Sequence, residues 1–263
     1  MTVSDDQPRI IYSGDEYLIL YKPPFMHSAP LLPDEGGTLS AWCAERFPGF
    51  LSVRGKKALE GGLLHRLDYG TSGLVFAALT QRVMDAMLGQ QERGLFVKSY
   101  EAVVCEKRQE LPGFPPCPAR PAIPVYGYGR TSRFRLQSGF RYYGAGRKAV
   151  RPVLPGGGNV KKCTLYQTEI LGMNMTEYPL WRVALRLTRG FRHQVRCHLA
   201  WLGLPILGDV LYGSEAGGAP LALRAVGLSF FDPLSGAPVR PRLPRQGWGG
   251  GGIAALVPDE PEE

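Results

Sequence analysis

The chain has 263 residues, 44% of them hydrophobic and 21% charged, which is the composition of an ordinary globular protein with room for one large domain or two small ones. No apolar segment approaches the roughly 20 residues of a membrane-spanning helix, and the polar, acidic N-terminus has no signal-peptide pattern. These features argue against a membrane or secreted protein and predict a cytoplasmic location.

The formal net charge of +8 is unevenly distributed along the chain. Residues 98–162 hold 13 Lys or Arg and three acids, a net charge of +10, which leaves −2 for the remainder. A basic middle on a slightly acidic body is typical of a polyanion-binding protein. Composition alone supports a solvated basic loop without a partner about equally well.

The five cysteines are odd in number, widely scattered and without a CxxC pair. A secreted disulfide framework is denser and even-numbered, so we interpret them as small buried hydrophobic residues. His193, Cys197 and His198 are close in sequence, but no second pair of ligands stands at a familiar spacing. The sequence therefore predicts no metal site.

The hydrophobic patterns of the first 105 residues predict strands and helices in turn. They are a strand within 15–24, a helix over 39–47 capped by Thr38, a strand over 73–79, a helix over 80–94 and a strand over 95–105. Val83, Met84, Met87 and Leu88 fall on one face of the second helix, which we expect to be packed.

Residues 109–160 differ from the rest because they are rich in Pro and Gly and mix eight Lys or Arg with seven aromatic residues. We predict a long excursion there with short strands at most. Paired strands are expected over 165–171 and 180–187, followed by a helix over 191–203 that ends at Gly203.

Strands and helices do not alternate in the regular order of a parallel sheet. We therefore predict an α+β fold, with a mixed, mainly antiparallel sheet and helices packed on its faces. The expected organisation is an N-terminal lead over 1–14, one domain over 15–246, and a Gly-rich, acidic and mobile tail over 247–263.

The segment His65-Arg66-Leu67-Asp68 lies between two apolar runs, 63–64 and 74–76, with a tight turn predicted at 71–73. The simplest interpretation of its adjacent opposite charges is a surface ion pair. The apolar flanks favour instead a partly buried carboxylate, which needs a cationic partner to stay ionised. Such an aspartate is a candidate nucleophile or general base.

A cation for Asp68 is available on the predicted helix 191–203, where Arg192 and Arg196 are one turn apart and share a face. An ordinary amphipathic helix with a basic outer side has the same pattern. The buried-looking segment GLPILGD that follows leaves little free surface at the end of the helix, which favours the first interpretation.

Several longer segments occur in a fixed order: DEYLILYKPP, HRLD with GTSG, VKSYEAVV, HQVRCHLA, LGLPILGDVLYG and LALRAVGLSFFDP. Together they resemble the RluA-type pseudouridine synthases over about residues 15–233. The resemblance implies one catalytic domain, built on a bent, mostly antiparallel sheet with a central cleft. It also implies an isomerase that converts uridine in ribosomal or transfer RNA to pseudouridine, without metal or cofactor.

The resemblance assigns roles by position. It implies that Asp68 is the catalytic aspartate, that Arg196 is its ion-pair partner, and that Tyr100 stacks on the target base and acts at its C5 proton. The resemblance also implies that Arg66 helps to displace the base from its stack and that Leu74 lines the pocket. Further substrate-binding residues are expected at His65, Lys98, Arg192 and His193.

The chemistry of the reaction agrees with these roles. The enzyme must break an N-glycosidic bond, turn the uracil and rejoin it through C5, which needs one carboxylate, a cation beside it and a dry pocket. An arginine lowers the pKa of a neighbouring aspartate by about 1–3 units. Extruding the base costs a few kcal/mol, which phosphate contacts and stacking on the aromatic residues of the basic middle would offset.

Two departures from the family pattern concern charges near the expected cleft. Tyr69-Gly70 stands where the family has Arg-Asp, and Phe191-Arg192 stands where it has Arg-Thr. We expect different RNA-positioning contacts, with Arg192 replacing the lost arginine. The sequence begins almost at the first motif, so we expect no N-terminal RNA-binding domain, and we expect a monomer. The alternatives are a non-catalytic RNA-binding or ribosome-assembly factor on the same fold, and an N-glycosidase that releases uracil.

Overall fold

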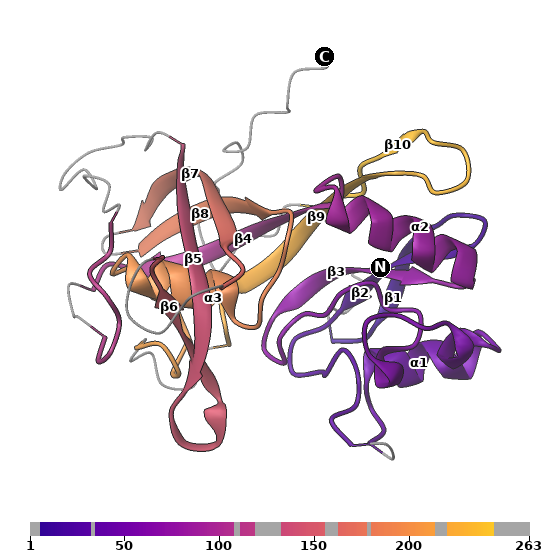
Figure 1. The fold of residues 1–263 in the computed structure, drawn as a ribbon, viewed down its shortest axis with the longest axis horizontal. Coiled ribbons are helices and arrows are strands. Elements are labelled where there is room, and N and C mark those ends of the chain that lie inside the picture. Colours follow the sequence, from indigo (N-terminus) through magenta and orange to yellow (C-terminus); the bar gives the residue numbers. More distant parts are fainter. Residues whose placement is uncertain are drawn as a thin grey trace. The chain divides into compact units, whose positions relative to one another are not determined.

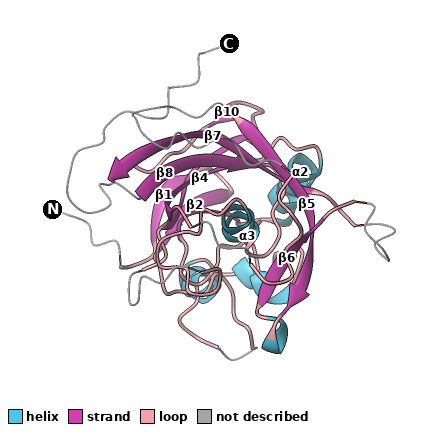
Figure 2. Ribbon diagram, turned by 90° about the vertical axis from the view of Figure 1, so that its left-hand side faces the viewer, coloured by secondary structure: helices cyan, strands magenta, loops and turns pink. Residues whose placement is uncertain are grey.

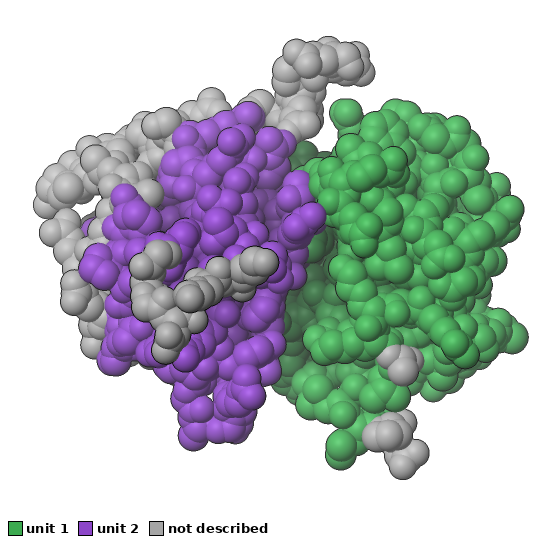
Figure 3. All heavy atoms as spheres, in the orientation of Figure 1, with its two compact units in different colours: residues 1–99, 224–243 green, residues 100–223, 244–263 purple. Residues whose placement is uncertain are grey.

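The computed structural model (Figure 1, Figure 2) describes residues 6–32, 35–107, 111–118, 133–155, 163–177, 180–213 and 220–244. The chain forms two compact units, coloured separately in Figure 3: residues 1–99 with 224–243, called unit 1, and residues 100–223 with 244–263, called unit 2. Much of the predicted excursion (109–110, 119–132 and 156–160) and the whole predicted tail lie outside the described residues. The domain boundaries given above stay a prediction.

Unit 1 contains a mixed sheet and two α-helices. Its strands are β1 (Arg9–Ser13), β2 (Tyr17–Lys22), β3 (Ser72–Ala78), β9 (Leu223–Phe231) and β10 (Pro238–Val239). Neighbouring strands pair antiparallel, except that β3 pairs with β9 in parallel. Its helices are α1 (Leu39–Arg46) and α2 (Gln81–Glu92), with 3₁₀ turns η1 (Phe50–Ser52) and η2 (Ala58–Glu60).

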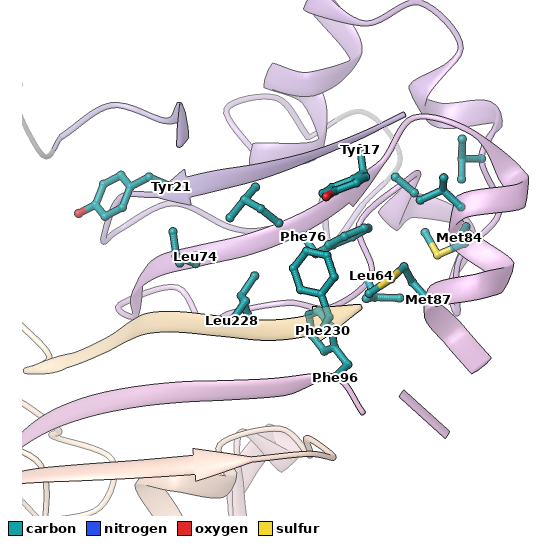
Figure 4. Close-up of a cluster of buried hydrophobic side chains, with 14 of the residues drawn as sticks. Tyr17, Tyr21, Leu64, Leu74, Phe76, Met84, Met87, Phe96, Leu228 and Phe230 are labelled. Atoms are coloured by element: carbon teal, nitrogen blue, oxygen red, sulfur yellow. The ribbon is translucent and has the colours of Figure 1, made fainter. Parts of the chain in front are cut away.

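The elements β2, α1, β3 and α2 form where the sequence predicts them, whereas β1 is a strand within the expected N-terminal lead. The side-chain oxygen of Thr38 accepts a hydrogen bond from the backbone N–H of Ala41 and so caps α1. All six residues of β2 are buried, and Val83, Met84 and Met87 of α2 join the core cluster that Figure 4 shows.

Aromatic rings fill the centre of that core. Phe76 stacks on Tyr17 with ring centroids 5.1 Å apart and contacts Phe96 and Phe230 edge to face. Because these rings come from β2, β3, β9 and the residue just before β4, their burial holds distant parts of the sequence together.

Unit 2 is built from antiparallel strands around one helix. Its elements are β4 (Val97–Cys105), β5 (Phe134–Tyr143), η3 (Ala145–Arg147), β6 (Ala149–Val153), β7 (Tyr166–Glu177), β8 (Leu180–Leu187) and α3 (Gln194–Trp201). The strand order is β4-β8-β7-β5-β6. Buried and half-buried residues alternate along β8, as predicted. Figure 2 shows α3 end-on, packed against β6 and β7.

Three local predictions need correction. The helix begins at Gln194, not at 191, because His193 has a left-handed backbone (φ 55°) and the side chain of Gln194 accepts the N–H of Phe191. Arg192 therefore precedes the helix and does not share a helical face with Arg196. The strand β5 has 10 residues, longer than expected, because β6 and β7 pair with it on its two edges.

The third correction concerns the turn after the segment 65–68. The N–H of Thr71 donates to the carbonyl of Asp68 at 3.0 Å, so the turn spans 68–71 and not 71–73. Residues 72 and 73 already belong to β3. The architecture is otherwise the predicted one, a mixed, mainly antiparallel α+β fold. In the part of the chain that the structure describes, no helix is long and apolar enough to cross a membrane.

Gly73 is required where β3 meets β9. Its φ is +126°, and a Cβ there would lie 2.2 Å from the carbonyl oxygen of Ala225. We predict that Gly73→Ala destabilises the protein by about 2 kcal/mol or more, through backbone strain and overpacking. Gly89→Ala is the control, because Gly89 lies in α2 with no atom near its added Cβ, and we expect it to stabilise by about 1 kcal/mol. Urea unfolding of both variants measures this, and similar effects would contradict the prediction.

Candidate active site

The loop that carries Asp68 is fixed by backbone hydrogen bonds on both sides. Before it, residues 62–64 pair with β3 through Ala78 N–H to Gly62 O (2.7 Å) and Leu64 N–H to Phe76 O (3.0 Å). After it, the 68–71 turn leads directly into β3. The Asp68 side chain is half-buried. The backbone on both sides of Asp68 is thus held by the sheet.

Ser28 holds the middle of this loop. Its hydroxyl accepts the N–H of Leu67 at 3.0 Å and donates to the Leu67 carbonyl at 2.9 Å, and Ser28 is itself buried. A residue from the segment after β2 therefore satisfies both backbone groups of the residue before Asp68.

Lys22 is a residue beside Asp68 that the sequence analysis did not single out. Its side chain is fully buried, and its Nζ donates to the carbonyls of Pro23 (2.8 Å), Met26 (2.8 Å) and Tyr69 (3.4 Å). Burial lowers the pKa of Lys22 to about 7, while the negative charge of Asp68 acts in the opposite direction. Lys22 is thus a cation within electrostatic range of Asp68 in the same unit. In the sequence, the position of this lysine at the end of an apolar strand could have indicated a buried amine.

Tyr69 packs beside this lysine-bound loop. Its ring lies 5.9 Å from that of Phe25 and 4.7 Å from that of His27, and 49% of the residue remains exposed. The residue that replaces the family's arginine is therefore an exposed aromatic side chain resting on two other rings.

Arg66 forms an ion pair with Glu60. The Arg66 Nε lies 3.0 Å from Glu60 Oε1, and the carboxylate is nearly buried while the guanidinium side chain is 42% exposed. Burial raises the pKa of Glu60, and the positive charges of Arg66, Lys57 and Lys56 oppose this. Glu60 was not singled out from sequence. Base displacement by Arg66 stays a prediction.

In unit 2, Arg196 is anchored by a buried carboxylate. Its Nε and Nη2 donate to the two carboxylate oxygens of Asp209 at 2.7 and 2.8 Å, and Asp209 also accepts the N–H of Leu211. The guanidinium carbon lies 5.4 Å from the ring centroid of Tyr212. A bidentate pair of this kind fixes the plane of the arginine. Asp209, in the LGD segment after α3, is a second residue that sequence reasoning missed.

Hydrogen bonds from α3 to two strands hold Arg196 in place. Gln194 donates to the carbonyl of Gln167 and the hydroxyl of Thr168, and His198 bonds Thr168 Oγ1 (2.7 Å) and Ser138 Oγ (2.9 Å). Burial lowers the pKa of His198 to about 3, so this histidine is neutral at physiological pH. Both ring nitrogens of His198 are engaged, and no group of three potential metal ligands occurs among the described residues.

Phe191, the second departure from the family pattern, lies in an aromatic cluster. Its ring stacks on Phe140 at 5.1 Å with planes 9° apart and contacts Tyr142 and Tyr166. Arg192 is exposed next to it. His193 lies within 3.3 Å of the Tyr212 hydroxyl through its Nδ1.

The structure distributes the predicted site residues over both units. Unit 1 holds Asp68, Arg66, His65, Leu74 and Lys98, and unit 2 holds Tyr100, Arg192, His193 and Arg196. Leu74 is fully buried in the core cluster of unit 1. The pairing of Asp68 with Arg196, the stacking role of Tyr100, the pocket role of Leu74 and the cleft itself stay predictions.

Comparison with known proteins identifies the class to which these motifs belong. Residues 16–201 match the RNA pseudouridylate synthase family. The chain belongs to this family, and the resemblance inferred from its motifs is confirmed.

Curated relatives carry related names. The chain is 28% identical over 229 residues to the uncharacterized RNA pseudouridine synthase YjbO of Bacillus subtilis, covering 86% of this chain and 68% of that protein. It is 32% identical over 214 residues to an uncharacterized RNA pseudouridine synthase of Chloroflexus aurantiacus (80% and 57%). It is 23% identical over 213 residues to ribosomal large subunit pseudouridine synthase D of Pasteurella multocida (78% and 53%). The chain thus spans between about half and two thirds of these relatives.

Solved structures confirm the fold. Human RNA pseudouridylate synthase domain containing 1 matches with a TM-score of 0.64 and 21% identity, covering 93% of this chain and 86% of that one. Human RNA pseudouridylate synthase domain containing 4 matches with a TM-score of 0.58 and 19% identity, covering 90% and 88%. At these identities the likeness establishes the pseudouridine synthase fold.

The buried amine of Lys22 makes stability depend on pH. Because its folded-state pKa of about 7 lies below the ordinary 10.5, the unfolded chain binds more protons between these values, and stability rises with pH. We predict that the unfolding free energy of the wild type, measured relative to that of Lys22→Met, rises by about 1–2 kcal/mol from pH 7 to 8.5. Urea unfolding at both pH values tests this. Exposed Lys57→Met is the control, and parallel profiles for wild type and Lys22→Met would refute the prediction.

Proposed function

We propose that this protein is an RNA pseudouridine synthase that isomerises uridines in structured ribosomal or transfer RNA, as a cytoplasmic monomer without metal or cofactor. The observation that carries the proposal is the rigid placement of Asp68 in a loop within the segment that matches the family. A loop whose backbone is held by Ser28, Lys22 and β3 places its aspartate before the substrate arrives, which is what a nucleophile needs.

In the proposed reaction, a carboxylate oxygen of Asp68 attacks C1′ of the target ribose. The N1–C1′ bond breaks, and its electron pair leaves with the uracil. After the base turns, C5 attacks C1′ and displaces the aspartate. The C5 proton leaves and N1 gains a proton, so the product is an isomer of the substrate. Tyr100 stacks on the base and acts at the C5 proton in this proposal.

Lys22 and Arg196 have different roles in the proposed mechanism. Lys22 holds the loop around Asp68 through three backbone carbonyls. Arg196, oriented by Asp209, is the proposed ion-pair partner of Asp68 during the reaction. A guanidinium whose plane is already fixed loses little freedom when it binds a second carboxylate.

The RNA partner is supported by charge and by the relatives. Residues 133–153, which include β5 and β6, carry six Lys or Arg and no acid. A relative from Pasteurella multocida is named for the large ribosomal subunit, which favours ribosomal RNA. The five free cysteines fit a reducing compartment such as the cytoplasm, where these RNAs lie.

Asp68→Asn tests the proposal. We expect pseudouridine formation on cellular RNA to fall by more than about 10³-fold, because the amide is neither nucleophilic nor charged, while RNA affinity stays within about twofold. The measurement maps pseudouridine in RNA from cells with the wild type, the variant or no protein. Asp85→Asn, on the exposed side of α2, is the matched control and retains activity.

The products separate the alternatives. Free uracil and abasic RNA would identify an N-glycosidase instead. A wild-type protein that binds RNA tightly but forms no pseudouridine on any cellular RNA would identify a non-catalytic factor. Full activity of Asp68→Asn would refute the assignment of the nucleophile.

A further inference from the structure

Lys98 is a buried cation without a counterion in the described part of the chain. It lies near the start of β4, it is 5% exposed, and its ammonium group forms no hydrogen bond or ion pair with the described residues. Burial lowers its pKa to about 8, and the charge that acts on it from the described residues is the positive one of Lys56. Buried lysines are ordinarily paired, because an unpaired ammonium bears the full free-energy cost of leaving water.

His65 supplies a second donor without an acceptor. Its Nε2 accepts the backbone N–H of Phe76 at 3.3 Å, so the ring proton of the neutral histidine is on Nδ1. Nδ1 is buried and has no hydrogen-bond partner among the described residues. The pKa of His65 is lowered well below its ordinary value by burial and by the charges of Lys98 and Lys56, which keeps the ring neutral.

The packing brings His65 and Lys98 to the same place. The imidazole of His65 contacts the ring of Phe96, with centroids 5.4 Å apart. Side chains alternate along an extended chain, so Phe96 and Lys98 project from the same side. Both are buried, while Val97 between them is only half-buried.

Lys56 is an exposed residue whose charge acts on both His65 and Lys98. Its Nζ donates to Gln91 Oε1 at 2.7 Å, and Gln91 Nε2 donates to the carbonyl of Leu64, the residue before His65. The charge of Lys56 also acts on Glu60, but that carboxylate is already paired with Arg66 at 3.0 Å. The three donor groups thus lie within electrostatic range of one another, and among the described residues none of them forms an ion pair with an acid.

We propose that Lys98, His65 and Lys56 bind a phosphate group, and that in the cell this is a backbone phosphate of the substrate RNA. Two ammonium groups and one N–H match an oxyanion that accepts several hydrogen bonds at once. The assignment to RNA rests on the proposed function. Lys98 lies two residues before Tyr100 on the same face of β4, and His65 lies three residues before Asp68, so the phosphate belongs to a nucleotide at or next to the target.

Thermal unfolding with inorganic phosphate, at constant ionic strength kept with sodium chloride, tests the site. We expect phosphate at ten times its dissociation constant to raise the Tm of the wild type by about 3 °C. Lys98→Met abolishes this shift, yet it melts at or above the wild type without phosphate, because the uncompensated buried charge is gone. A purely structural lysine would give a lower Tm and leave the phosphate response unchanged.

Adjacent exposed lysines give a matched control. Lys56→Met weakens the phosphate response, whereas Lys57→Met retains it. Lys98→Gln is the second variant if Lys98→Met does not fold. The site is refuted if phosphate gives no more stabilisation than chloride, if the response survives both substitutions of Lys98, or if Lys56→Met and Lys57→Met behave alike.

A second arm separates RNA from free phosphate. We expect a uridine oligonucleotide to bind Lys98→Met with a slope of log affinity against log salt that is smaller by about 0.7, the value for one lost phosphate contact on a single strand. An unchanged slope beside a lost phosphate response would assign the site to free phosphate and overturn the RNA part. Neither arm measures isomerisation, so failure here is distinguishable from failure of the proposed activity.

Discussion

The buried ammonium of Lys22 is the interaction on which the Asp68 loop depends. One side chain, at the end of β2, binds backbone carbonyls on both its own segment and the segment after Asp68. The residue is fully buried, so its Nζ hydrogen-bonds these carbonyls in place of bulk solvent. The loop therefore has little freedom to move away from the sheet.

In unit 2, the ion pair of Arg196 with Asp209 also fixes the orientation of a polar group. Arg196 is held by the two oxygens of Asp209, while α3 itself is held by His198 and Gln194 on β5 and β7. Both units thus use a buried polar group to orient a backbone or a side chain. Buried polar contacts of this kind add precision more than stability.

The sequence predicted those structural features that depend on residues close together along the chain. The apolar run of β2, the cap at Thr38 and the alternation of β8 are local patterns, so they could be read directly. Glu60 and Asp209 could not be found in this way, because an acid's partner is chosen by tertiary contacts. The start of α3 was also missed, because a histidine in the sequence does not indicate the left-handed backbone conformation that His193 adopts before the helix.

The division of the chain between the units has a consequence for biosynthesis. The elements of unit 2 from β4 to α3 follow one another without interruption, but unit 1 needs β9 for its core, since Leu228 and Phe230 pack with Phe76 there. The ribosome therefore synthesises the described strands of unit 2 before β9 and β10 of unit 1. The apolar edge of β3 therefore stays unpaired in the nascent chain until residues 224–231 emerge. During this interval we expect chaperones to bind the exposed edge.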